Sequence, residues 1–486
     1  MTYMYKAWYP IIPVEFLDRE KPQHFKLMNM DLVVWNDGKV EGRSEAFGSK
    51  KDRQRGAKRS YGTWRVFADS CPHRKVPLSE GRIEDDGTLM CSYHAWRWTG
   101  DADLCAVPQA QSENELLKIQ SNPKSKCNSF PAKVESGLLW VWPESGDDAR
   151  LESALTEVPM MKLPNEVDAS IDEDRIFTGT WNFRELPYSH DSFLENVVDP
   201  AHVPSSHHNV VGNRYADTNP LFVDTTKPVT KDGFEISVKQ NPKEGGAVPP
   251  TSTTEFVAPG LVKIEAPAGE GAVSILELYS SPSRPGFCNH VGRQVVIKGA
   301  NGEIPALLKV FLLPMPKWLN HVLAGLFLNQ DALFLHAQER KMHETKQYTT
   351  LLSSADEEPY HYTKAVLPMT ADKGVVHFRN WIKNKAGGRI PYQYNPSMPS
   401  VDNEVVFDIY NSHTKHCKNC MDALQNLRKA RLFSYLAAAI VGVLRPARLG
   451  AVGNVLITAL LGSIGIGINK LIGAMHRLEY SHAEND

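Results

Sequence analysis

The sequence has almost no net charge. Its 54 Lys and Arg residues nearly balance its 56 Asp and Glu residues, so the formal charge at pH 7 is −2. Domains that bind nucleic acid usually carry a strong excess of positive charge. The composition therefore argues against a nucleic acid partner. The sequence also contains no internal repeat and no low-complexity tract, so we expect ordinary globular domains.

Cysteine is too scarce and too scattered for a disulfide framework. The seven cysteines are an odd number, and they are spread through a chain of 486 residues. Metal-binding or redox roles are therefore expected before disulfides. The cysteines are Cys71, Cys91, Cys105, Cys127, Cys288, Cys417 and Cys420.

The N-terminus lacks the features of a targeting segment. The first ten residues contain neither the apolar core of a secretory signal nor an Arg- and Ser-rich amphipathic leader. Either the protein needs no import signal or the signal is missing from this sequence, and the residues leave both possibilities open.

Length and pattern predict three regions. At roughly 150 residues per domain, the chain is long enough for two or three domains. Short runs rich in Val, Trp and Leu predict a β-rich first region, followed by an acidic, Pro-containing linker at 144–163. The second region mixes strand-like runs with helical stretches at about 188–200 and about 317–347. The three regions are 1–160, 165–410 and 411–486.

The C-terminus contains two apolar stretches that predict a helical hairpin. Residues 449–468 are twenty residues without a charge, long enough to cross a bilayer. Residues 432–444 are apolar but too short for a full span, and 445–448 would form the turn. A hairpin buried in a soluble core is the alternative. We favour membrane association because the position is terminal and basic residues flank the stretches. These residues are Arg428, Lys429, Arg431 and Lys470.

Two Cys-His pairs predict a Rieske cluster. Cys71 and His73 form a C-x-H motif, and Cys91 and His94 form a C-x-x-H motif after seventeen intervening residues. A Rieske [2Fe–2S] centre needs two thiolates on one iron and two imidazoles on the other, each pair at the tip of a tight loop. A structural zinc site also takes two Cys and two His. Zinc fingers usually have separate Cys and His pairs, so the mixed pairs favour the Rieske centre.

A second iron site is predicted in the middle of the chain. His202 and His207 lie five residues apart, just beyond a predicted helix. Two histidines and one carboxylate on one face of Fe(II) leave positions open for O₂. Asp331 is the candidate carboxylate, because an acid in an apolar helical run is costly unless it is paired or bound to metal. A surface-facing Asp331, or His208 in place of His207, remains open.

Several sequence runs resemble the pheophorbide a oxygenase family. This family of plants, algae and cyanobacteria also contains chlorophyllide a oxygenase, protochlorophyllide-related oxygenases and an inner-envelope translocon-associated Rieske protein. The resemblance covers nearly the whole chain. The runs are 64–74, 77–83, 91–96, 108–110, 137–143, 195–208, Gln330-Asp331 and Gln338-Glu339.

The resemblance implies an α+β fold. An N-terminal Rieske β-domain would precede a helix-grip catalytic domain, in which a curved antiparallel sheet surrounds a long helix, and a hydrophobic helical hairpin would follow. Family members resemble ring trimers in which the cluster of one subunit serves the iron of its neighbour. Asp199 would then lie in the electron path between the partner subunit's His94 and His202 of its own subunit, without ligating the iron.

The resemblance also implies the reaction. A ferredoxin-like donor would reduce the cluster, and O₂ would be used to oxygenate a chlorophyll-derived tetrapyrrole at a chloroplast membrane, or at a thylakoid or plasma membrane in a cyanobacterium. Two alternatives remain. One is an oxygenase of another hydrophobic ring such as a sterol. The other is a redox-sensing or import-associated protein with little catalysis, although a sensor would not need the residues of an iron site.

A C-x-x-C motif precedes the C-terminal hairpin. Alone, Cys417 and Cys420 could be a redox dithiol or half of a metal site. No second pair lies nearby in the sequence, which favours the dithiol, and the family resemblance implies a thioredoxin-type reductant. Two inert thiols are the alternative. Chlorophyllide a oxygenases generally lack this pair, which argues against that member of the family.

The chain departs from the family at two places. Ala95 stands where Gly usually follows the second cluster histidine, so the local conformation is expected to differ slightly. The basic insertion between Val40 and Thr63 is longer than usual. It could dock an acidic electron donor, but we expect a variable, solvated loop.

Overall fold

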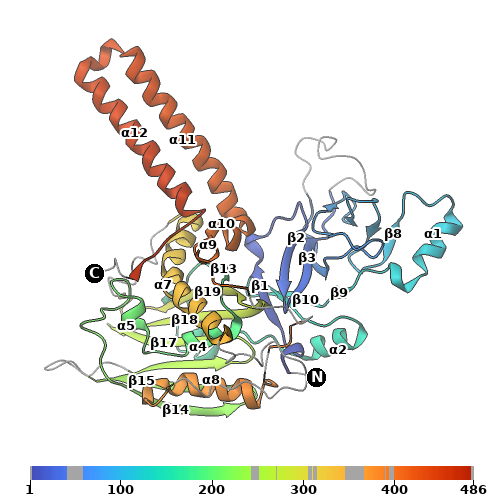
Figure 1. Ribbon diagram of the computed structural model, residues 1–486, viewed down its shortest axis with the longest axis horizontal. Coiled ribbons are helices and arrows are strands. Elements are labelled where there is room, and N and C mark those ends of the chain that lie inside the picture. The colour runs from blue at the N-terminus through green and yellow to red at the C-terminus, as the bar shows by residue number, and fades with distance from the viewer. Residues whose placement is uncertain are drawn as a thin grey trace.

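The computed structural model describes residues 3–40, 59–241, 251–269, 271–304, 309, 315–344, 366–388, 390–392 and 399–482. Most of the basic insertion, residues 41–58, lies outside this set. Figure 1 shows three parts: a β-rich N-terminal part, a larger sheet with helices, and a long helical hairpin that projects from the body. The α+β class is confirmed.

Three small sheets form the N-terminal part. Four strands pair in the order β2-β3-β4-β9, four more in the order β5-β6-β7-β8, and three in the order β1-β11-β10. The strands are β1 (Tyr9–Pro13), β2 (Gln23–Leu27), β3 (Met30–Asn36), β4 (Trp64–Ala68), β5 (Arg82–Ile83), β6 (Leu89–Met90), β7 (Arg97–Trp98), β8 (Leu104–Ala106), β9 (Ser129–Phe130), β10 (Ala132–Glu135) and β11 (Leu138–Val141). The predicted β-rich start of the chain is thus confirmed.

The second part is one antiparallel sheet of eight strands. Its order is β12-β19-β18-β17-β16-β15-β14, and β13 also pairs with β19. Strand β14 is mostly exposed, whereas β18 and β19 contain no exposed residue. The strands are β12 (Ile176–Thr178), β13 (Asn182–Leu186), β14 (Leu221–Thr230), β15 (Gly233–Gln240), β16 (Ser252–Val257), β17 (Leu261–Gly269), β18 (Ala272–Arg284) and β19 (Phe287–Ile297).

Three helices accompany this sheet, and one of them, α7, carries the candidate iron ligand Asp331. They are α4 (His190–Val197), α7 (Lys317–Glu344) and α8 (Lys373–Asn384). Helix α4 packs on β18 and β19, and α7 contacts both α4 and β13. Both helices predicted here are present, but α4 ends three residues before Pro200, whose ring disfavours helical backbone at the residue before it. The last three residues predicted for the longer helix lie outside the described ranges.

The hydrophobic core runs across the expected boundary near residue 160. Trp140 packs edge-on against Tyr279, with ring centroids 5.3 Å apart, and Ser281 donates a hydrogen bond to the carbonyl oxygen of Pro10 at 2.7 Å. The expected linker contains a helix, α2 (Asp147–Leu155), whose C-terminal side accepts a hydrogen bond from Trp8. The N-terminal sheet β1-β11-β10 thus shares one core with the eight-stranded sheet, whereas the loops that carry Cys71 and Cys91 pack in a separate small core.

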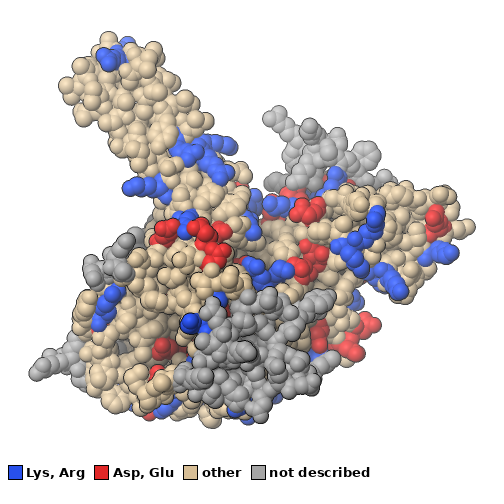
Figure 2. All heavy atoms as spheres, viewed as in Figure 1, with Lys and Arg blue, Asp and Glu red and all other residues tan. Residues whose placement is uncertain are grey.

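The C-terminal region is an antiparallel hairpin of α11 (Lys418–Leu444) and α12 (Gly450–Ala474). Helix α11 is longer than the apolar stretch at 432–444 because it continues through the polar residues before it. Within the described chain, one helix is long and apolar enough to cross a membrane, Ala447–Ala474, and only 11% of its most apolar stretch is buried. The alternative of a buried soluble hairpin is therefore wrong for this helix. Figure 2 shows basic side chains at both ends of the hairpin and few along its length.

The chain after the hairpin returns to α7. The amide of Leu478 donates to the carbonyl oxygen of Phe407 at 3.2 Å, and Asn329 on α7 donates to the carbonyl oxygen of Leu478. Further along, Tyr480 accepts a hydrogen bond from Gln330 at 3.2 Å. Residues 476–482 therefore lie against the helix that carries Asp331.

Candidate functional site

Two loops of the same shape carry the four predicted cluster ligands. The loop after β4 presents Cys71 and His73, and the loop after β6 presents Cys91 and His94. In each loop the amide of the fourth residue after the cysteine donates to the cysteine carbonyl oxygen, at 2.8 Å and 3.0 Å. The cysteine amide donates in turn to the carbonyl oxygen of the fifth residue, also at 2.8 Å and 3.0 Å. The shared pattern gives both Cys-His pairs the same local geometry.

The thiols of this group lie inside and the imidazoles lie at the surface. Cys71 and Cys91 are buried, His73 is exposed and His94 is half-buried. The two imidazole centroids are 4.7 Å apart, and Trp96 stacks on His73 at 4.5 Å. A cluster held here would turn its histidine edge towards solvent, where electrons can enter or leave.

The group is too open for one zinc ion. A tetrahedral zinc with two sulfur and two nitrogen ligands needs ligand atoms about 3.6 Å apart. Two groups of the described part of the chain bring three or more ligand atoms within 4.8 Å of one another, and neither contains these four residues. A two-iron cluster takes its thiolates and imidazoles at opposite ends, which requires the wider spacing. The residues fit a [2Fe–2S] cluster and argue against the zinc alternative.

The predicted mononuclear site forms a compact group. Nε2 of His207 lies 3.2 Å from Oδ2 of Asp331, and Nε2 of His202 lies 3.8 Å from the same oxygen. All three ligand atoms lie within 4.8 Å of one another. The histidines come from the segment around the short helix α5 (Val203–Ser206), and the carboxylate comes from α7. Two imidazoles and one carboxylate fit the donor set that non-haem Fe(II) prefers.

Hydrogen bonds fix how both imidazoles face the site. Nδ1 of His202 lies 2.6 Å from the carbonyl oxygen of Asp199, and Nδ1 of His207 lies 2.9 Å from Oε1 of Gln330. Oxygen acceptors at Nδ1 place the proton there and leave the Nε2 lone pairs directed at Asp331. Tyr480 fixes the orientation of the Gln330 amide, because its hydroxyl accepts from the amide nitrogen at 3.2 Å.

The structure selects between the two candidate histidines. Nδ1 of His208 accepts the amide hydrogen of Arg214 at 3.0 Å, and its ring packs edge-on against Tyr215. His207 faces Asp331, so His208 is the wrong choice in this geometry. The surface-facing alternative for Asp331 is also wrong, because its side chain is largely buried.

Two neighbours of this triad were not identified from the sequence. Asn196 donates from Nδ2 to Oδ2 of Asp331 at 3.1 Å, and the Phe327 ring stacks on His207 with centroids 4.1 Å apart. Burial would raise the pKa of Asp331, but the hydrogen bond and charge of His207, the charge of His202 and the Asn196 hydrogen bond lower it. Only the helical spacing of Phe327, one turn before Asp331, could have indicated its position.

Asp199 contacts His202 mainly through its backbone. Its carbonyl oxygen accepts from Nδ1 of His202, whereas its carboxylate caps the amide of Ala201 at 2.8 Å and lies 3.8 Å from the same Nδ1. Burial raises the pKa of the Asp199 carboxyl, and His202 opposes that shift. The residue therefore orients His202, while its role as a bridge involves a second subunit and stays a prediction.

Two family models match the chain. One, described as the Rieske [2Fe-2S] domain, matches residues 7–131, and the other, described as pheophorbide a oxygenase, matches residues 256–348. The chloroplastic pheophorbide a oxygenase of Oryza sativa subsp. japonica is 31% identical over 424 residues, which cover 84% of this chain and 70% of the rice protein. The chain belongs to the pheophorbide a oxygenase family.

Other known proteins extend the comparison. Flavonoid 8-hydroxylase 2, chloroplastic, of Ocimum basilicum is 27% identical over 84% of this chain and 72% of its own length. The crystal structure of dicamba monooxygenase bound to dicamba superposes with a TM-score of 0.52 at 17% identity, covering 80% of this chain and 98% of that protein. At this identity the likeness shows the fold, which agrees with the architecture in Figure 1.

Membership in the pheophorbide a oxygenase family makes the chain a Rieske non-haem iron oxygenase. Its cofactors are a [2Fe–2S] cluster and a mononuclear iron, and both predictions are confirmed. Enzymes of this kind take electrons from ferredoxin-type donors and use O₂. The assignment of individual ligands rests on the geometry above and stays a prediction.

Ala95 is strained relative to the glycine usual in this family. Its φ is 56°, in the left-handed region, and Lys75 in the matching loop has a φ of 62°. A left-handed conformation costs a residue with a Cβ about 1 kcal/mol. We expect Ala95→Gly to stabilise the cluster domain by about 0.5–1 kcal/mol. Urea denaturation followed by the visible circular dichroism of the cluster measures this change.

A matched control is Ala106→Gly in β8. Ala106 is also partly buried but lies in a regular strand, where glycine destabilises by about 0.5–1 kcal/mol. Equal destabilisation by both substitutions would contradict the strain at Ala95.

A buried acid pair predicts a pH-dependent stability. The amide and hydroxyl of Ser189 both donate to Glu339, and the same hydroxyl lies 2.5 Å from Asp191. Burial and the neighbouring Asp191 raise the pKa of Glu339 to about 7, although Arg340 at 3.1 Å opposes them. Burial raises the pKa of Asp191 to about 6. The folded protein therefore binds protons here that the unfolded chain releases.

Because the folded pKa of Glu339 is raised, its protonation stabilises the fold at low pH, and this contribution is lost as the pH rises from about 4.5 through about 7. We expect Glu339→Gln to remove this dependence, so that the variant gains up to about 3 kcal/mol relative to wild type between pH 5 and pH 8. Urea unfolding at both pH values, followed by tryptophan fluorescence, measures the difference. Parallel pH profiles for the two proteins would show that Glu339 keeps an ordinary pKa.

Proposed function

We propose that this chain is a membrane-associated oxygenase that uses O₂ and ferredoxin-derived electrons to oxygenate a chlorophyll-derived tetrapyrrole. The observation that supports this most is the convergence of His202, His207 and Asp331 in a chain that matches a pheophorbide a oxygenase over most of both lengths. A sensor or import-associated protein would have no need of this group, which makes that alternative weaker.

His202, His207 and Asp331 would hold the iron, and Cys71, His73, Cys91 and His94 would hold the cluster. The bound iron would supply activation of O₂ for insertion into a C–H bond or a macrocycle double bond, and the cluster would supply the electrons.

The surrounding residues prepare the iron site. Gln330 and the carbonyl group of Asp199 each accept an imidazole proton and so keep both Nε2 atoms free for the metal. Asn196 holds the Asp331 carboxylate in place. The ring of Phe327 covers one face of His207 and excludes water from it. These side chains fix the ligands before iron binds.

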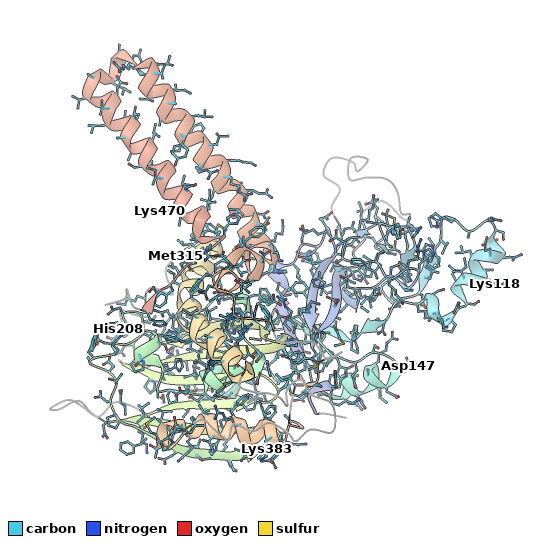
Figure 3. All side chains as sticks on the ribbon, in the orientation of Figure 1. Lys118, Asp147, His208, Met315, Lys383 and Lys470 are labelled. Carbon is cyan, nitrogen blue, oxygen red and sulfur yellow. The ribbon has the colours of Figure 1, made fainter. Side chains whose placement is uncertain are left out.

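The trimer belongs to the same proposal. Figure 3 shows His208, beside the iron group, and Lys118, on α1 (Glu113–Gln120), on opposite sides of the molecule. Helix α1 lies next to strand β8 of the sheet that carries the cluster loops. Fast electron transfer needs a short path, so a neighbouring subunit would supply the cluster. The partner subunit's His94 would then approach Asp199.

The hairpin supports attachment to a membrane. Helix α12 has 25 residues and is therefore about 38 Å long, enough to cross a hydrocarbon core of about 30 Å. Exposed apolar side chains include Leu456 and Leu460 on α12 and Phe433 on α11. The relatives are named as chloroplastic, so we place the protein at a chloroplast membrane, thylakoid or envelope, or at a thylakoid or plasma membrane if it is cyanobacterial.

Oxygenation of another hydrophobic ring is the second candidate. The similarity to a flavonoid 8-hydroxylase over 72% of that protein favours it, and a sterol is a further possibility of the same kind. A thioredoxin acting on Cys417 and Cys420 stays a prediction. Both thiols are buried, so a reductant would have to act on an opened form.

Product labelling tests the proposal. The full chain would be supplied with ferredoxin, its reductase and ¹⁸O₂, together with pheophorbide a, chlorophyllide a, protochlorophyllide, a flavonoid and a sterol in separate reactions. Mass spectrometry would then look for ¹⁸O in each product. Label in one tetrapyrrole supports the proposal and identifies the substrate. Label only in the flavonoid or the sterol supports the second candidate, and no label with both iron centres present would refute catalysis on these rings.

A further inference from the structure

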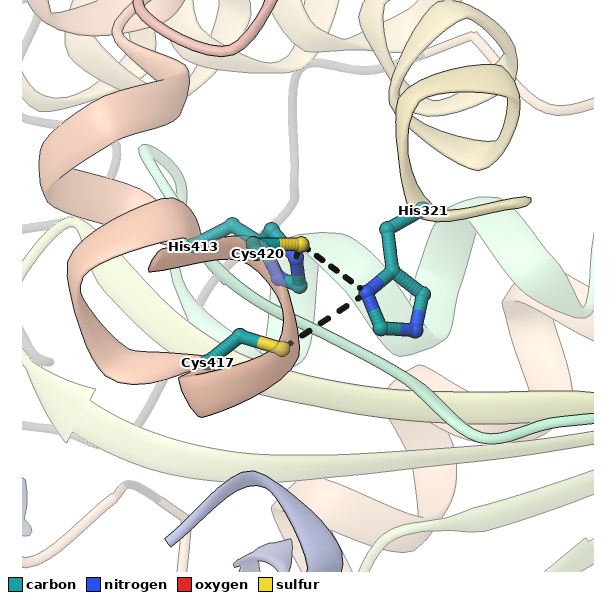
Figure 4. A group of neighbouring side chains, drawn as sticks. All are labelled: His321, His413, Cys417 and Cys420. Atoms are coloured by element: carbon teal, nitrogen blue, oxygen red, sulfur yellow. Dashed lines mark hydrogen bonds between the residues drawn. The ribbon is translucent and has the colours of Figure 1, made fainter. Parts of the chain in front are cut away.

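A second compact group of metal-binding side chains lies at the base of the hairpin. Figure 4 shows His321, His413, Cys417 and Cys420 turned towards one another. Nδ1 of His321 lies 3.2 Å from Sγ of Cys420 and 3.7 Å from Sγ of Cys417. Nε2 of His413 lies 3.2 Å from Sγ of Cys420. All four ligand atoms lie within 4.8 Å of one another.

These separations match a tetrahedral site. Zinc–sulfur bonds of about 2.3 Å and zinc–nitrogen bonds of about 2.0 Å place neighbouring ligand atoms about 3.5–3.8 Å apart. The measured nitrogen–sulfur distances of 3.2, 3.2 and 3.7 Å are close to that range. The predicted Rieske ligands do not converge in this way. The group at the hairpin base is therefore sized for one ion and not for a two-iron cluster.

The orientation of His413 is fixed as in a metal ligand. Its Nδ1 lies 2.5 Å from the carbonyl oxygen of Phe183 on β13, so the proton sits there and the Nε2 lone pair faces the thiols. His321 turns Nδ1 towards both thiols, and Phe16 packs against the rings of both histidines. Among the described residues, Nε2 of His321 has no hydrogen-bond partner, so the ring is held by its Nδ1 contacts with the two thiols and by packing against Phe16.

Charge and burial also favour a metal. Cys417 and Cys420 are 0% and 1% exposed, and both histidines are buried. Zn²⁺ with two thiolates and two neutral imidazoles has no net charge, which suits a buried site. Both sulfurs are buried, so exchange with a reductase would require an opened form, whereas metal binding requires no opening.

We propose that His321, His413, Cys417 and Cys420 bind one structural zinc ion that joins the base of the hairpin to helix α7. His321 lies on the second turn of α7, and Cys417 caps the N-terminus of α11, which leads into the hairpin. On binding, the two cysteines release their thiol protons to solvent, and no electrons are transferred. The C-x-x-C motif is thus half of a metal site whose other half comes from histidines.

Metal analysis of the full chain in detergent tests this proposal. Protein produced with both iron and zinc in the medium should contain one zinc per chain beside three iron atoms, and the zinc should survive dialysis against EDTA. Zinc K-edge absorption fine structure should show two sulfur and two nitrogen neighbours. These measurements use the wild-type chain, so they test the zinc site even if substitutions prevent folding.

Variants add a second test. We expect His321→Ala and Cys420→Ser to lower the zinc content to below about one tenth of wild type while the cluster keeps its electron paramagnetic resonance spectrum. Cys105→Ser is the matched control, because Cys105 lies outside the group, and it should keep its zinc. Protein with complete iron centres but no zinc, zinc without sulfur neighbours, iron in place of zinc, or a Cys417–Cys420 disulfide in the isolated protein would each overturn the proposal.

Discussion

Replacing Asp331 with Ala is expected to abolish turnover and remove the mononuclear iron while the spectrum of the Rieske cluster stays unchanged. Asp331 is the only carboxylate in the triad, and both histidine Nε2 atoms face its Oδ2 atom. Two neutral imidazoles alone leave the charge of Fe(II) unbalanced and one ligand position lost. The cluster loops lie in a separate small core and should not respond. Iron analysis, the cluster spectrum and ¹⁸O₂ incorporation measure the three effects.

Two further variants sharpen this prediction. Asn196→Ala removes only the hydrogen bond that positions the carboxylate, so we expect about 10–100-fold weaker iron binding without complete loss. Asp224→Ala removes an exposed carboxylate of β14 in the same part of the chain and should have no effect. Turnover that survives in Asp331→Ala would refute the ligand assignment.

Replacing Asp199 with Asn is expected to lower turnover by about 10–100-fold while both iron centres are retained. The substitution keeps the backbone carbonyl group that orients His202 and an oxygen that can cap the amide of Ala201. Only the negative charge is lost, and that charge is what a bridge between two histidines would supply. Iron content and the reduced cluster spectrum should therefore match wild type, and the rate of electron transfer to the iron should fall.

A rapid-mixing experiment measures this directly. Protein with a fully reduced cluster would be mixed with O₂ and substrate, and re-oxidation of the cluster followed optically. Glu195→Gln is the matched control, since Glu195 lies one helical turn earlier and pairs with Arg379 at 2.6 Å. It should change stability and not the rate of re-oxidation. Equal re-oxidation rates for wild type and Asp199→Asn would exclude the bridge.

The sequence was sufficient where ligands are local. Cys71 and His73, and likewise Cys91 and His94, are fixed by loops whose hydrogen bonds connect residues four or five apart. Spacing alone therefore indicates the geometry. Asp331 could be proposed because an acid in an apolar helix needs a partner, and the helix places it opposite the two histidines.

The sequence is insufficient where neighbouring side chains come from distant parts of the chain. His321 lies 96 residues before Cys417, and only the packing of α7 against α11 brings them together. No pattern near the C-x-x-C motif indicates this proximity, which is why the sequence alone favours a redox dithiol there. The contact between Tyr480 and Gln330 cannot be predicted from the sequence either, because it forms only when the chain returns along α7 after the hairpin. The apolar stretch at 432–444 predicts only the second half of helix α11, because the first half of the helix is polar.

Helix α7 holds the hairpin at two points. His321 lies beside the thiols where α11 begins, and Asn329 and Gln330 bind the segment that follows α12. A body attached to its anchor at two points cannot swivel about it. If the hairpin is embedded in lipid, the enzyme would keep a constant face towards the bilayer surface. A lipophilic pigment would then search for the entrance by lateral diffusion in two dimensions, and it would arrive with one preferred orientation of its ring.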